Sequence, residues 1–145
     1  DELFIAERGA GAWMNGAPLT VSPTTVFLQA VLATGFSYDI ERRGDNFGLF
    51  MHFTNLTRAV RRAGSAALDL CYVASGRFDG YWEASLQPWD TAAGALMVVE
   101  AGGTVTDYAG AHYDIESPGL IASNGNVHAD LLAGIQQVAE RAGER

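Results

Sequence analysis

The chain has 145 residues, 48% of them hydrophobic and 18% charged, and its formal net charge is −8. This composition is typical of a globular domain with an apolar core, and it excludes a disordered or fibrous chain. A surface of that charge repels phosphate backbones, so we expect no nucleic-acid partner. The longest apolar run, 92–99, is far shorter than the roughly 20 residues of a membrane helix, so we expect no membrane partner. The single cysteine, Cys71, fits a packing role and a reducing cytoplasm.

The first 22 residues differ in pattern from the rest. We expect two short strands around a glycine-rich turn, ending at Asn15-Gly16, a pair that favours tight hairpin turns. Residues 1–22 are therefore interpreted as the tail of a preceding domain, and residues 23–145 as one α/β domain. Because the chain opens on the strand-like Asp1 to Ile5 and lacks a starting Met, we expect a fragment or a processed chain.

From Pro23 onward, strands are expected to alternate with helices. The predicted strands are 26–34, 59–61, 78–83, 104–107 and 120–122, and the predicted helices are 45–56, 66–75, 91–101 and 127–139. In the first helix Asp45 is the expected cap, and the apolar residues Phe47, Phe50, Phe53 and Leu56 recur every three positions. This alternation predicts a layered α/β/α sandwich with a mixed sheet.

Asp90 lies in the most informative stretch, 88–103, where we expect it at a helix N-cap. There a backbone N–H and the positive end of the helix would stabilise its carboxylate. A purely structural cap is the simple alternative. The small residues of the first turn let a ligand approach closely, and Trp89 is expected to anchor the turn, so Asp90 is a candidate site residue.

Two further stretches carry candidate binding residues. The turn Gly64-Ser65 enters a helix of small residues, and its exposed N–H groups suit an anion or a hydroxyl-rich ligand. On the strand that follows, Tyr81 and Glu83 share one face. Glu83 precedes Asp90 by seven residues across a turn, so we expect both carboxylates to face one cleft.

The remaining polar and aromatic candidates are assigned to structural roles. The three histidines, His52, His112 and His128, lack the spacing of metal ligands. The aromatic residues Trp13, Tyr81 and Trp82 are expected in the core or at a domain interface. For Arg61 and Arg62, phosphate binding and a partner surface both remain open.

The run from Trp89 to Gly103 resembles the signature W-D-x-A-A-G-x-x-x-x-x-E-A-G-G of the inositol monophosphatase family. The segments R-R-x-G-S-A-A-L and D-x-Y-W-E are similar to family segments in the same order, and 1–16 resembles the end of the family's N-terminal domain. The resemblance covers essentially the whole chain and about the second half of the family's usual length. It implies the C-terminal domain of that fold.

The resemblance also implies an activity and a set of site residues. The expected enzyme is a Mg²⁺-dependent phosphatase acting on inositol monophosphate or a related small polyol or sugar phosphate, with water attacking phosphorus directly. By the same resemblance, Asp90 coordinates Mg²⁺ and approaches the substrate. Gly64, Ser65, Ala66 and Glu83 would bind substrate hydroxyls. Family members are commonly homodimers.

One family motif is missing from these 145 residues: the D-P-x-D-G-T segment that holds most of the metals. We therefore expect the chain alone to be inactive, with a missing N-terminal half supplying the other ligands. The alternative is a non-catalytic α/β binding or regulatory module that retains the fold.

Overall fold

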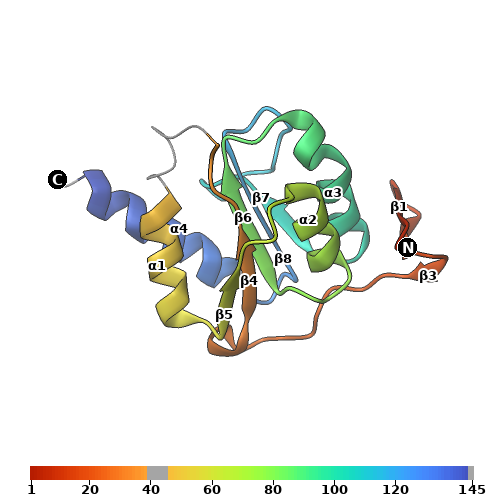
Figure 1. Ribbon diagram of the computed structural model, residues 1–145, viewed down its shortest axis with the longest axis horizontal. Helices are drawn as coiled ribbons and strands as arrows, with labels where there is room; N and C mark the ends of the chain where they lie inside the picture. Colours follow the sequence, from red (N-terminus) through yellow and green to blue (C-terminus); the bar gives the residue numbers. More distant parts are fainter. Residues whose placement is uncertain (39–45, 144–145) are drawn as a thin grey trace.

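A five-stranded sheet forms the centre of the molecule, in the order β5-β4-β6-β8-β7 (Figure 1). The computed structural model describes residues 1–38 and 46–143. The strands are β4 (Val31–Thr34), β5 (Ala59–Arg61), β6 (Gly80–Ala84), β7 (Thr104–Thr106) and β8 (Gly119–Ser123). Strands β5 and β6 run parallel to β4, whereas β8 is antiparallel to both β6 and β7. The predicted mixed sheet is confirmed.

Helices cover both faces of this sheet. They are α1 (Phe47–Leu56) and α4 (His128–Gly143) on one face, and α2 (Ala66–Ala74) and α3 (Pro88–Glu100) on the other (Figure 1). Strand β6 shows why helices pack on both faces. Its consecutive residues Tyr81 and Trp82 are both fully buried, and their side chains point to opposite faces of the sheet. Tyr81 packs in the cluster that contains Leu70 of α2, and Trp82 packs in the cluster that contains Phe53 of α1. The α/β/α architecture is therefore as predicted.

The first 18 residues form a separate three-stranded antiparallel sheet, one strand more than expected. Its strands are β1 (Phe4–Glu7), β2 (Gly11–Met14) and β3 (Ala17–Pro18). Asn15 and Gly16, with φ of 52° and 82°, form the turn between β2 and β3, as the Asn-Gly pair predicts.

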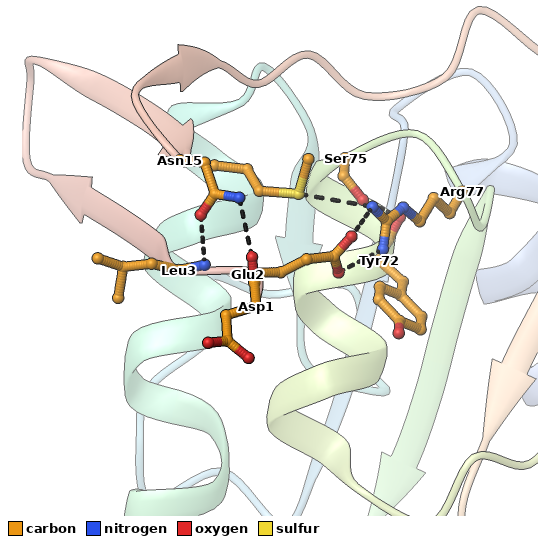
Figure 2. A network of polar contacts seen from close by, with 8 residues as sticks. Asp1, Glu2, Leu3, Asn15, Tyr72, Ser75 and Arg77 are labelled. Carbon is orange, nitrogen blue, oxygen red and sulfur yellow. Dashed lines mark hydrogen bonds and ion pairs between the residues drawn. The ribbon is translucent and has the colours of Figure 1, made fainter.

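This small sheet is fastened to α3 and to the end of α2. The Glu100 carboxylate accepts hydrogen bonds from the N–H groups of Gly9 and Gly11, at 2.8 and 3.0 Å. Figure 2 shows the second attachment, where the Arg77 guanidinium pairs with the Glu2 carboxylate and lies over the ring of Tyr72, 4.9 Å from its centroid. The division of the chain at residue 22 stays a prediction, and these contacts show that the two segments pack together.

The predicted strand 26–34 is wrong in its first half. Residues Phe27–Gln29 form a 3₁₀ turn, η1, because the N–H of Ala30 donates to the carbonyl of Phe27. Local bonds of this kind occupy backbone groups that a strand would offer to its neighbour. Leu28 is 67% exposed, which a buried strand would not allow.

The predicted apolar face of the first helix is wrong in part, since Phe53 is buried as predicted. Phe47 and Leu56 are 54% and 44% exposed, and the buried residues of α1 are Leu49 and Phe53. Residues three apart in an α-helix are rotated by about 60° from alignment, so a long row of them winds around the helix. The predicted cap, Asp45, lies outside the described residues, and the N-cap of α1 is Asn46.

The other predicted helices form within four residues of their expected bounds, and α4 buries Leu131 and Ile135 as expected. Within residues 1–38 and 46–143, no helix combines the length and apolar character needed to cross a membrane.

Candidate active site

A pocket of about 470 Å³ opens where strands β4 and β6 end and helices α2 and α3 begin. Because β4 and β6 are parallel, their carboxyl ends meet at one edge of the sheet, the usual place for a ligand in α/β folds. All of the sequence-predicted site residues line it: Gly64, Ser65, Ala66, Glu83 and Asp90. The structure thus brings together residues from three separate segments.

The wall formed by α2 begins with a glycine turn. Gly64 has a φ of 90°, a conformation that favours glycine, and a Cβ there would meet nothing within 4 Å. Ser65 is the N-cap, and its Oγ accepts a hydrogen bond from the N–H of Leu68 at 3.4 Å. The N–H groups of the first turn, at Ala66 and Ala67, have no partner within a helix and lie at the pocket. This end of α2 therefore favours an anionic or oxygen-rich ligand.

Asp90 is the third residue of α3, not its N-cap, so the predicted position within the first turn is wrong. The helix begins at Pro88, because proline suits the first helical position, and Gln87 is the N-cap. The Asp90 carboxylate reaches back to accept a hydrogen bond from the N–H of Gln87 at 3.0 Å. Its orientation at the pocket is therefore fixed by the start of the helix.

Trp89 does not anchor this turn, contrary to expectation. Its side chain is 78% exposed and forms part of the pocket lining. The turn is instead positioned by the backbone of Ser85, which has the unusual φ of 62° and donates its N–H to the carbonyl of Pro118.

Glu83 is held at the pocket by two neighbours. The Tyr81 hydroxyl donates a short hydrogen bond to Glu83 Oε2, as expected for two residues on one strand face. Gly35, at the end of β4, lies directly against the Glu83 carboxyl group, and a Cβ on Gly35 would overlap it. The position of Glu83 thus depends on a glycine far away in sequence.

Burial raises the pKa of the Glu83 carboxyl, and the negative charge of Asp90 adds to that effect. The Tyr81 hydrogen bond and the Arg62 charge act in the opposite direction without cancelling it. The influence of Asp90 and Arg62 on Glu83 shows that the pocket carries both signs of charge.

Of the two arginines that the sequence left open, only Arg62 lines the pocket; Arg61 is exposed at the end of β5. The Arg62 guanidinium lies over the ring of Phe36, 5.6 Å from its centroid. Phe36 in turn packs against Phe47 and Phe50, with ring centroids 5.3 and 5.7 Å apart. These contacts hold a positive charge beside the two carboxylates.

Sequence reasoning missed two residues behind the pocket. Asn46 joins the ends of β4 and β6: its amide donates to the carbonyl of Gly35 and its oxygen accepts from the Trp82 ring N–H. Asp69, in α2, is buried beside apolar residues. A charged residue on the buried side of an amphipathic helix is a signal that was readable for Asp69, whereas no local pattern marks Asn46.

The histidine and cysteine assignments fit their surroundings. His128 is buried, and its ring nitrogens lie 2.9 Å from the hydroxyl oxygens of Thr106 and Ser123. His112 is exposed, and Cys71 packs against the core on the α2 face. Within the described part of the chain, no three His, Cys, Asp or Glu residues are grouped to hold a metal ion.

The donor set nevertheless suits a share in a Mg²⁺ site. Mg²⁺ prefers carboxylate oxygens and is usually held by one or two of them together with substrate phosphate. Asp90 offers such a carboxylate at the pocket. It fits one coordination position, and residues 1–38 and 46–143 do not complete the shell by themselves.

The fold and pocket define an α/β/α protein with a pocket at the carboxyl ends of two of its strands, lined by carboxylates, an arginine and two helix N-termini. Residues 1–140 match the sequence profile described as the inositol monophosphatase family. The chain belongs to that family.

Individual relatives agree with this assignment. The chain is 45% identical over 131 residues to an inositol-1-monophosphatase of Synechocystis, a match that covers 90% of this chain and 46% of the relative. It is 44% identical over 138 residues to the Nus factor SuhB of Pseudomonas aeruginosa, covering 93% and 51%. The solved inositol monophosphatase of Anabaena superposes with a TM-score of 0.91 at 46% identity, covering 94% and 55%. The chain thus spans about half the length of these relatives.

Proposed function

We propose that the chain is the C-terminal part of a Mg²⁺-dependent phosphatase that hydrolyses inositol monophosphate or a related small polyol or sugar phosphate. The observation that carries this proposal is the convergence of Gly64–Ala66, Glu83 and Asp90 on one pocket. Each contributes a group that such a substrate needs, and family membership supports the reaction class.

The substrate would be bound through both its hydroxyls and its phosphate. The Glu83 carboxylate, oriented by Tyr81, accepts hydrogen bonds from ring hydroxyls. The free N–H groups at Ala66 and the preceding turn bind further substrate oxygens. Arg62 provides a charge that complements phosphate.

Asp90 would hold Mg²⁺, which supplies charge neutralisation for the phosphate and activation of water when bound. The hydrogen bond from the Gln87 N–H orients the carboxylate toward the pocket. The remaining metal ligands are assigned to the N-terminal half of the enzyme. The chain on its own would then lack activity.

The test is phosphate release from inositol 1-phosphate at saturating Mg²⁺, measured for the full-length protein and for residues 1–145 alone. We expect turnover of about one per second or faster from the full-length protein and none from the isolated chain. Absence of turnover by the full-length protein on inositol, sugar and polyol phosphates would overturn the proposal. Turnover by the isolated chain would refute the claim that other ligands are required.

A non-catalytic binding role is the second candidate, because a relative of 44% identity is named as a Nus factor. Under that role, cells that carry the Asp90→Asn protein in place of the parent would grow like the parent strain. Under the phosphatase role, the same cells would grow like a strain that lacks the protein.

The proposed setting of the enzyme follows from the family resemblance and the composition. We propose a homodimer in the cytoplasm, acting on a small phosphorylated substrate and without a nucleic-acid partner.

A further inference from the structure

Asp69 is a buried carboxylate that the proposed chemistry does not use. Its side chain is only 1% exposed, and its Oδ1 atom has no hydrogen-bond partner among residues 1–38 and 46–143. An ionised carboxylate buried without a partner is costly, whereas the neutral acid largely avoids that cost. Among the described buried side-chain atoms it stands alone in this respect.

The helix places Asp69 directly behind the pocket. Residues three apart on an α-helix share a face, so Asp69 lies one turn deeper than Ala66, which lines the pocket. Its backbone N–H donates to the carbonyl of Ser65, the N-cap. Helix α2 packs against β6, the strand that carries Tyr81 and Glu83. The buried acid and the pocket carboxylate are therefore on facing elements.

We propose that Asp69 is a positioning residue for Glu83: by remaining a neutral acid behind the pocket wall, it leaves Glu83 free to carry the negative charge that meets the ligand. While the two groups hold one proton, Asp69 keeps it and Glu83 is ionised. When Asp69 releases that proton to solvent, two negative carboxylates face each other, and their repulsion shifts Glu83 from the position in which the Tyr81 hydrogen bond holds it. Ligand binding should therefore weaken as Asp69 loses its proton.

The electrostatic surroundings support this arrangement. Burial raises the pKa of Asp69 to about 7, and the charge of Glu83 contributes to the shift. Burial raises the pKa of Tyr81, whose hydroxyl donates to Glu83, and the charges of Glu83 and Asp69 add to that effect. The charge state of Asp69, Tyr81 or Glu83 therefore affects the pKa of a neighbouring group among the three.

The other elements around α2 bring few competing charges. Strands β4 and β8 carry no titratable side chain within Val31–Thr34 and Gly119–Ser123. Helix α3 brings Asp90, whose charge acts on Glu83, and Glu100, which is bonded to the small sheet. Arg62, in the loop before α2, acts to lower the pKa of Glu83. Burial of its hydroxyl raises the pKa of the half-buried Tyr108, and the charge of Glu83 adds to that effect.

The direct test is a titration of side-chain carboxyl groups by ¹³C NMR in the full-length protein without Mg²⁺. We expect the Asp69 signal, assigned through its own backbone, to keep its proton until about pH 7. In Glu83→Gln the Asp69 midpoint should fall by about half a pH unit or more, because the opposing charge is gone. In Asp79→Asn, a change at a buried carboxylate elsewhere, it should not move. An Asp69 signal that titrates near pH 4, or that ignores Glu83→Gln, would overturn the inference.

The second test uses Asp69→Asn, which mimics the neutral acid and cannot ionise. In the parent, KM for inositol 1-phosphate should rise about threefold or more between pH 6 and pH 8.5, since half a pKa unit corresponds to that factor. In Asp69→Asn this rise should disappear, while KM at pH 6 stays close to that of the parent. A rise of equal size in both proteins would contradict the inference.

The KM test rests on the proposed function, whereas the NMR titration does not. If the full-length protein releases no phosphate, the proposed function fails, and the Asp69 titration in the parent still decides the inference. That measurement needs no variant, so a misfolded Asp69→Asn protein leaves it intact.

Discussion

Two buried aspartates of this chain have opposite surroundings. Asp79, 6% exposed at the start of β6, accepts hydrogen bonds from the Ser22 hydroxyl and from the N–H of Val31. Ser22 is supported in turn by the Asn124 amide at 2.9 Å. Asp69, 1% exposed beside the pocket, has an oxygen without any described partner.

This difference separates a structural carboxylate from a functional candidate. The bonds of Asp79 join three distant segments, and each of its two carboxyl oxygens accepts a hydrogen bond. The charge of Asp69 is not compensated in this way, and its pKa is raised to about 7. Near the pocket, burial thus raises the pKa of Asp69. At the opposite end of the sheet, the buried Asp79 links distant segments through hydrogen bonds.

The sharpest challenge to this comparison is Asp79→Ala. We expect a loss of about 3 kcal/mol in the free energy of unfolding of the full-length protein, because the buried Ser22 hydroxyl and the partly buried Val31 N–H lose their acceptor. Urea denaturation measures this loss. Replacing the exposed Glu140 with Ala is the control and should change stability little. If Asp79→Ala behaves like the control, Asp79 is not a structural carboxylate.

Asp90→Asn tests the role of the pocket, and its expected effect on activity is nearly as large in free energy as the effect of Asp79→Ala on stability. Asn keeps an oxygen that can accept from the Gln87 N–H, but it removes the charge that Mg²⁺ requires. We expect activity to fall by a hundredfold or more, about 2.7 kcal/mol, with stability within about 1 kcal/mol of the parent.

Asp130→Asn is the matched control for Asp90→Asn, because Asp130 is also the third residue of a helix, α4, and is exposed away from the pocket. It should lose a similar small amount of stability and no activity. Near-parental kcat in Asp90→Asn would show that Asp90 is only a structural cap.

Asp69→Asn should alter the pH dependence of stability. A carboxyl whose pKa is raised on folding binds more protons in the folded state, so its contribution to stability declines as pH rises from about 4 to about 7. We expect Asp69→Asn to gain about 2 kcal/mol relative to the parent between pH 5 and pH 8, at 1.4 kcal/mol per pKa unit with the shift only partly expressed. Thermal unfolding at the two pH values measures this. A difference that stays constant between the two pH values would contradict the raised pKa of Asp69.

Gly35→Ala tests how tightly the fold positions Glu83. The added Cβ would overlap the Glu83 carboxyl, so the side chain must move. We expect KM for inositol 1-phosphate to rise about tenfold, the size of one lost hydrogen bond to a charged group. Gly143→Ala, where a Cβ meets nothing, is the control. An unchanged KM in Gly35→Ala would remove Glu83 from the binding site.

Arg77→Ala should have the smallest effect. The Arg77–Glu2 pair is 37% and 41% exposed, so water and salt screen it. We expect only a slight loss of thermal stability that disappears at high salt, since the Glu100 bonds still hold the small sheet. A large loss would mean that the attachment in Figure 2 is a main support of the small sheet.

Local sequence patterns were enough to predict the layers of the fold and the convergence of the candidate site residues on one pocket. The opposite directions of Tyr81 and Trp82 follow from the two-residue period of a strand, and the signature around Asp90 marks the start of a helix. These patterns depend on residues close together in the chain. For the same reason the Gly-Ser turn and the small residues after it were enough to place Gly64, Ser65 and Ala66 at a helix start.

Which polar groups are compensated, in contrast, depends on packing between distant segments. The partner of Asp79 is Ser22, 57 residues away, and the residue that presses on Glu83 is Gly35, at the end of a neighbouring strand. Nothing in the local sequence predicts that Asp79 has hydrogen-bond partners for its carboxyl group while an oxygen of Asp69 has none among the described residues, or that Arg62 rather than Arg61 lines the pocket. Hydrogen bonds and charge pairs of this kind form only when the fold brings their segments together, so their energies cannot be read from the spacing of residues along the chain.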